Sequence, residues 1–136
     1  MAFPEIKYCL ICDAVRAEAL GKLTLLGFFG VTPDVQIKIK DFRQPLQAAF
    51  VLVGGTGEGS ARVGFQFADA RNQVLLATPQ ADAGPIEPGK RLLTGVGISH
   101  TFPGPGRYFF RVVVDDRVHY QTSFELYQGT PADFTV

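Results

Sequence analysis

Short runs in which apolar and polar residues alternate follow one another along the whole chain, separated at even intervals by clusters of glycine and proline. Alternation with a period of two is typical of half-buried β-strands, whereas an amphipathic helix repeats every three to four residues. The 12 Phe and 4 Tyr also favour strands, and the 15 Gly and 9 Pro supply turns between them. The pattern therefore constrains the chain to an all-β fold.

Nine strands are predicted, at residues 5–16, 22–31, 34–40, 46–54, 60–69, 72–79, 90–102, 107–115 and 118–127. The alternation is clearest in 60–69, where Val63, Phe65 and Phe67 share one face. No shift in composition divides the chain, and 136 residues can bury a core without disulfides. We expect one domain over residues 1–136, a two-sheet antiparallel β-sandwich of immunoglobulin-like or related topology.

The segment 13–22 (DAVRAEALGK) also fits a short helix, with Asp13 able to cap its start and Gly21 its end. So short a helix is marginal in water. Leu20, Gly21 and Lys22 can equally form the turn of a hairpin joining the first two strands. We favour the hairpin.

Residues 102–108 (FPGPGRY) end in a Gly-x-Tyr that opens a long alternating strand. This arrangement resembles the tyrosine corner of immunoglobulin-like sandwiches, over about the last 35 residues of the chain. The two cysteines lie only three residues apart and tryptophan is absent. Antibody-type homology is therefore excluded, although the architecture is not.

The opening YCLICDAVRAEALGKLTLLGFFG places Cys12-Asp13 before a Gly21-Lys22 turn and a strand ending in Gly-aromatic-aromatic-Gly. This pattern resembles an uncharacterised family of small bacterial proteins of about 130 residues, a domain of unknown function. The resemblance is strongest over residues 8–30. It implies a bacterial, intracellular β-sandwich and carries no activity or site residue over to this chain.

The charge balance excludes several partners. Thirteen basic residues face thirteen acidic ones without blocks of like charge, so the basic footprint that nucleic acid or anionic lipid requires is missing. The apolar run from Tyr8 to Cys12 is too short for a secretory signal or a membrane span. We expect a cytoplasmic protein with reduced thiols, bound to neither nucleic acid nor membrane.

Cys9 and Cys12 form a C-x-x-C pair that elsewhere serves redox chemistry or zinc. Here the pair lies within an apolar strand, where positions i and i+3 face opposite sides of the sheet. His100 and His119 lack the spacing of a zinc module, although they could still meet the thiols in space. We predict packed, inert thiols, with metal binding and a reactive cysteine as open alternatives.

Three further candidate sites are weak. The loop 54–60 (GGTGEGS) lacks the lysine and the following helix of a phosphate-binding loop. The chain's three serines lack a strand-turn-helix elbow. Five aspartates in predicted loops could gather calcium but are also ordinary turn formers. The serines are Ser60, Ser99 and Ser123, and the aspartates are Asp34, Asp69, Asp82, Asp115 and Asp116. We predict no catalytic residue, metal site or cofactor.

Several strands are apolar on both faces, more than a two-layer sandwich can hide. The candidate interface comprises Leu23, Leu25, Phe28, Phe29, Phe109 and Val113. A second copy of the chain could cover this surface, or the loop 80–91 and the C-terminal tail could fold over it. The sequence thus predicts a non-catalytic interaction or scaffolding module that binds a protein partner or itself. The alternatives are a carrier enclosing a small hydrophobic ligand and, third, an enzyme using Cys9, Cys12 or the histidines.

Overall fold

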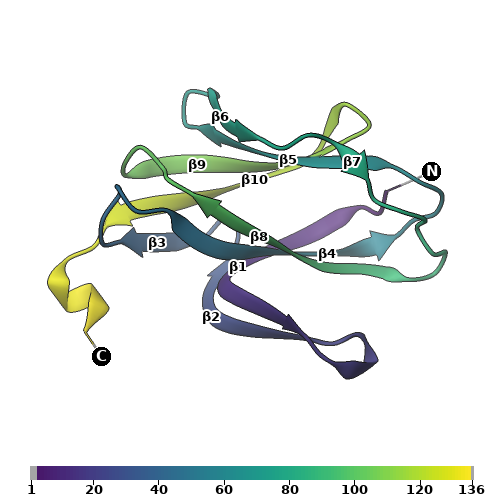
Figure 1. Cartoon of the computed structure of the whole chain (residues 1–136), viewed down its shortest axis with the longest axis horizontal. Coiled ribbons are helices and arrows are strands. Elements are labelled where there is room, and N and C mark those ends of the chain that lie inside the picture. The colour runs from purple at the N-terminus through teal and green to yellow at the C-terminus, as the bar shows by residue number, and fades with distance from the viewer. Residues whose placement is uncertain (1–2, 136) are drawn as a thin grey trace.

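The computed structural model describes residues 3–135, which form two β-sheets packed face to face (Figure 1). The ten strands of this part of the chain are β1 (Ile6–Ala17), β2 (Leu23–Val31), β3 (Gln36–Ile39), β4 (Leu46–Thr56), β5 (Arg62–Asp69), β6 (Val74–Ala77), β7 (Ala81–Asp82), β8 (Arg91–His100), β9 (Gly106–Val114) and β10 (Arg117–Gln128). Each of the nine predicted strands overlaps one of these. Only β7 is missing from the prediction, because two residues are too few to show an alternation.

The first sheet has the order β2-β1-β4-β8, and the second has the order β3-β10-β9-β5-β6, with β7 also pairing with β5. All pairs are antiparallel except one: β3 runs parallel to β10, with Ile37 opposite Leu126. The purely antiparallel expectation was wrong for this pair. The two strands come from distant parts of the chain, so no hairpin dictates their relative direction.

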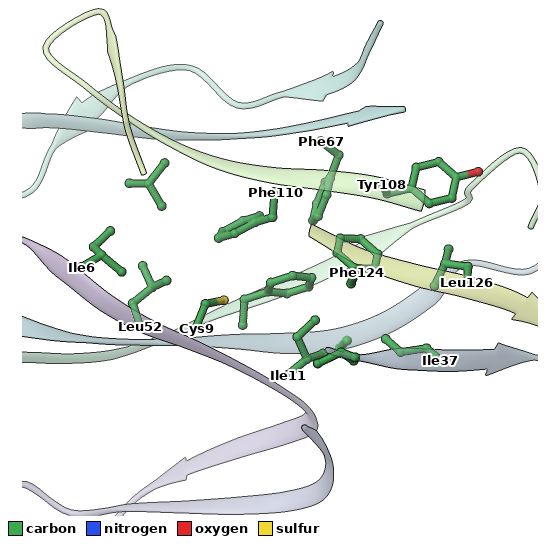
Figure 2. Packing of buried hydrophobic residues seen from close by; sticks show 14 of the residues in the cluster. Ile6, Cys9, Ile11, Ile37, Leu52, Phe67, Tyr108, Phe110, Phe124 and Leu126 are labelled. Carbon is green, nitrogen blue, oxygen red and sulfur yellow. The ribbon is translucent and has the colours of Figure 1, made fainter. Parts of the chain in front are cut away.

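The core between the sheets is built around aromatic rings. Phe50 of β4 is fully buried, and its ring centroid lies 4.5 Å from that of Phe110, 5.4 Å from that of Phe124 and 5.5 Å from that of Phe67. These partners come from three strands of the opposite sheet, and Figure 2 shows them converging on the space between the layers. The Phe50 ring therefore couples the two sheets directly.

The predicted tyrosine corner is present as a hydrogen bond. The Tyr108 hydroxyl donates to the carbonyl oxygen of Gly104 over 2.6 Å. The tyrosine ring packs 4.8 Å from that of Phe102, so the turn before β9 is tied both by a polar contact and by the core.

Replacing Tyr108 by phenylalanine is expected to cost about 1 kcal/mol, because the Gly104 carbonyl loses its donor while the ring stays in place. Urea denaturation of the two proteins measures the difference. Tyr8→Phe is the control, since Tyr8 is more than half exposed. Equal unfolding midpoints for the two variants would show that this hydrogen bond does not contribute to stability.

The first two strands form a hairpin, as expected, and the competing helix over 13–22 is absent. A short 3-10 turn at Ala19–Gly21 joins them, with Leu20 and Gly21 both at positive φ. The structure adds a bend. The pairing of β1 with β2 has a bulge between Ile11 and Cys12. The pairing of β1 with β4 ends at Cys12, and beyond that residue β1 pairs with β2 alone. The far half of the hairpin consequently folds against β4 and β8, on the side of these strands away from the second sheet (Figure 1).

This folded-back hairpin makes a second, smaller apolar cluster. Cys12, Ala49 and Val51 are its buried members, and Val15, Leu23 and Leu25 pack against them. A Cβ at Gly95 would lie 3.3 Å from a methyl of Val15, so the hairpin contacts β8 closely. The chain itself thus covers much of the second apolar face that the sequence predicted.

The loop 80–91 and the tail do not cover that face. The tail ends in a 3-10 turn, Pro131–Phe134, beside β3 and β10. Asp133 pairs there with Lys38 over 2.7 Å, and the Lys38 ammonium is the main reason that the pKa of Asp133 falls to about 2. The loop instead borders the opening between the two sheets.

Candidate functional site

The six residues of the predicted interface do not form one surface. Leu23 and Leu25 are half-buried between the hairpin and the four-stranded sheet. Phe109 and Val113 lie on β9 of the other sheet, and their neighbours Phe110, Val112 and Val114 point into the core, so these two face outward. Alternation predicts which face of a strand is apolar but not to which sheet the strand belongs.

Val113 is not available for docking. It is buried, and it lies opposite Gly64, over which the Gln80 side chain folds. Gln80 Nε2 donates to Asp116 Oδ1 over 2.8 Å, and its Oε1 accepts from the Asp116 backbone N–H over 2.9 Å. These two hydrogen bonds hold the Gln80 side chain over Gly64, beside Val113, and Phe109 is half-buried further along β9.

Phe28 and Phe29 of the predicted interface are exposed, over 56% and 37% of their surfaces. Leu26, at 48%, and Val31, at 43%, accompany them on β2. We call these four residues the apolar edge, because β2 is the outermost strand of its sheet. Leu26 and Val31 lie outside the interface predicted from the sequence, although both belong to the same uncharged run.

The two cysteines lie on opposite faces of β1, as their spacing predicted. Cys9 belongs to the main core and Cys12 to the smaller cluster beneath the hairpin, and both thiols are free. Burial raises the pKa of Cys9 to about 12, and burial together with the Asp13 carboxylate raises that of Cys12. Both sulfurs are therefore protonated at neutral pH, the form that is neither nucleophilic nor metal-binding.

The two histidines contact different groups. The His100 ring lies 4.7 Å from Phe102 and 6.1 Å from Phe67, and desolvation lowers its pKa. His119 Nε2 lies 2.8 Å from the carbonyl oxygen of Pro4. Within residues 3–135, no three His, Cys, Asp or Glu side chains are close enough to hold a metal.

Three of the five candidate aspartates accept hydrogen bonds from backbone N–H groups, whereas Ser99 and Ser123 lie within β8 and β10. Asp69 Oδ1 accepts from the backbone N–H groups of Arg71 and Gln73, both at 2.9 Å. Asp82 accepts from Gly84, and Asp115 accepts from the Arg62 backbone. The glycine-rich segment 54–60 leads into strand β5, so no helix N-terminus follows it. Asp69 and Asp82 thus hold backbone turns, and Asp115 ties the turn between β9 and β10 to the start of β5.

A groove of about 590 Å³ opens between the two sheets, where β8 of the first sheet faces β5 and β7 of the second. We call it the inter-sheet groove. Leu52, Leu92 and Val96 line it from the first sheet, and Val63 and Phe65 line it from the second. Ile86 of the loop 80–91 borders it, and Phe3 and Pro4 also contribute to its walls. No sequence pattern signals this groove, because its walls come from four separate parts of the chain.

Comparison of the sequence with protein-family models and with curated proteins returned no match. Within the described part of the chain, no helix has the length and apolar character needed to cross a bilayer.

Proposed function

We propose that this protein is a non-catalytic binding module that docks on a protein partner through the apolar edge, and that a second copy of the chain can be that partner. The observation that carries the proposal is the exposure of Leu26, Phe28, Phe29 and Val31 on a sheet-edge strand. Natural edge strands are usually protected by charge or proline, because their open backbone groups recruit other strands. The strand β2, Leu23–Val31, contains neither a charged residue nor a proline.

Self-association fits the shape and chemistry of this strand. A strand that pairs antiparallel with its own copy makes a twofold contact, the commonest symmetry of soluble oligomers. The aromatic rings of Phe28 and Phe29 are of the type enriched at interface centres. The bends at Gly27 and Gly30, both at positive φ, divide β2, so we expect pairing along only part of its length.

The state of the thiols supports a binding role over catalysis. Burial raises the pKa of both cysteines, and His119 is engaged by the N-terminal backbone. The two free thiols also suit a reducing compartment, which supports a cytoplasmic location.

Light scattering coupled to size exclusion, over a dilution series, tests the proposal. We expect a concentration-dependent dimer, and we expect Phe28→Lys to raise its dissociation constant at least about tenfold, because a lysine on the edge cannot be buried against a second apolar strand.

Val74→Lys is the matched control. Val74 is 48% exposed, as Leu26 is, but lies on β6 of the other sheet. This variant should dimerise like the unmodified protein. A protein that stays monomeric at every concentration, or equal weakening by both lysines, would contradict docking of a second copy through the apolar edge.

A further inference from the structure

The inter-sheet groove lies at the open side of the sandwich, away from β2. Its walls are the edge strand β8 on one sheet and β5 with β7 on the other, so it enters the space between the layers. Binding in this groove is independent of docking through the apolar edge, because β8 and β2 are opposite borders of the four-stranded sheet.

The floor of the groove is continuous with the main core. Leu52 is almost fully buried, and Val63, Phe65, Leu92 and Val96 are half-buried and pack against the core cluster. The volume of about 590 Å³ falls within the range typical of small-molecule sites. The groove therefore has the volume and the apolar lining that a short alkyl chain requires.

One end of the groove is anchored by the N-terminal segment. Pro4 is buried, and its carbonyl oxygen lies 2.8 Å from His119 Nε2. The Phe3 ring meets the His119 ring edge to face, with centroids 5.5 Å apart. These two contacts fix the segment to β10, so Phe3 and Pro4 form an ordered wall of the groove.

The rim carries two acidic residues, Asp82 and Glu87, and two basic ones, Lys90 and Arg91. Lys90 pairs with Glu87 at 3.9 Å, and Asp82 Oδ1 accepts from the Gly84 N–H at 2.9 Å. Arg91, the first residue of β8, makes neither a side-chain hydrogen bond nor an ion pair with any residue in 3–135. Of the two rim cations, Arg91 is thus the one that no carboxylate of residues 3–135 pairs with.

We propose that the inter-sheet groove binds a single-chain amphiphile with an anionic head group. The alkyl chain lies against Leu52, Val63 and Val96, and the head group pairs with Arg91. A guanidinium suits this task because its donors match the two oxygens of a carboxylate. The sequence left an enclosed cavity open as an alternative; the structure has an open groove, since the two sheets do not close into a barrel within the described residues.

Titration calorimetry with decanoate, decanol and decylamine, each below its aggregation concentration, tests the proposal on the full chain. We expect saturable binding in the order decanoate, decanol, decylamine. Arg91→Gln should weaken decanoate about tenfold and leave decanol unchanged, since only the charge contact is removed. Arg71→Gln, in the turn between β5 and β6, is the control for loss of a surface charge.

Ala83→Trp tests the position of the site. Ala83 is exposed and lines the groove, so a tryptophan there should block all three probes without disturbing the core. Ala70→Trp adds the same ring at an exposed turn outside the groove and should bind normally. Dimer formation should be the same in both tryptophan variants, which separates this result from the outcome of the docking experiment.

Three outcomes would overturn the proposal. The first is the absence of saturable binding of any probe, and the second is decanoate binding that survives Ala83→Trp. The third is equal affinity for decanoate and decanol, which would remove the role of Arg91.

Discussion

Replacing Phe50 by alanine is expected to lower the free energy of unfolding by about 4 kcal/mol. The side chain is fully buried and its ring contacts Phe67, Phe110 and Phe124 of the opposite sheet, so truncation leaves a cavity at the centre of the core. Aromatic pairs contribute beyond the area that they bury, and this variant loses three of them. Urea denaturation followed by circular dichroism measures the change.

Two further variants keep the Phe50 experiment interpretable. Phe50→Leu should cost less, because it fills part of the cavity, and it provides a measurable value if the alanine variant does not fold. Phe134→Ala removes an aromatic ring that is 42% exposed and should cost far less than either. An alanine variant as stable as Phe134→Ala would show that the ring cluster is not the main contact between the sheets.

Replacing Gly54 by alanine is expected to cost about 2 to 3 kcal/mol, although the change adds only one methyl group. A Cβ at Gly54 would overlap the carbonyl oxygen of Glu5 and lie 3.2 Å from the Cα of Ile6. The obstacle is backbone, so β1 would have to shift away from β4 at the irregularity between Ile6 and Tyr8. Overpacking of this kind destabilises by a few kcal/mol.

The adjacent glycine provides the control for Gly54. A Cβ at Gly55 would meet nothing within 4 Å, and neither glycine has a positive φ. Gly55→Ala should therefore leave the unfolding midpoint nearly unchanged. Equal midpoints for the two variants would mean that β1 and β4 separate at this point without cost.

The apolar edge and the inter-sheet groove lie in different parts of the molecule. The edge belongs to β2, at one border of the four-stranded sheet, and the groove lies beside β8, at the other border. A ligand in the groove and a partner on the edge could thus be bound at the same time, which makes their separate tests independent.

The two cysteines are an example of strand geometry that the sequence predicts correctly. Their spacing predicted opposite faces, and the structure confirms it, with Cys9 in the main core and Cys12 beneath the hairpin. The prediction succeeds because the period of a strand is a local property of the backbone. Local geometry also accounts for the Gly21 turn and for the hydrogen bond from Tyr108 to Gly104.

The candidate interface depends on a bend in the hairpin that strand alternation does not predict. Leu23 and Phe28 belong to one predicted strand, yet the bend of the hairpin turns Leu23 towards the sheet and leaves Phe28 exposed. Gly27, at positive φ, permits the bend, because a Cβ there would overlap the Asp13 carboxylate. Nothing in the alternation of residues 22–31 distinguishes a bent strand from a straight one.

The amino-acid order by itself determined the strands, the turns between them and the two-faced apolar character that calls for extra cover, since these depend on neighbours within a few residues. Only the tertiary structure decided which sheet each strand joined, that the hairpin supplied the cover, and that a groove with Arg91 at its mouth remained between the sheets. Those outcomes depend on contacts between segments far apart in the chain, whose energies no local pattern contains.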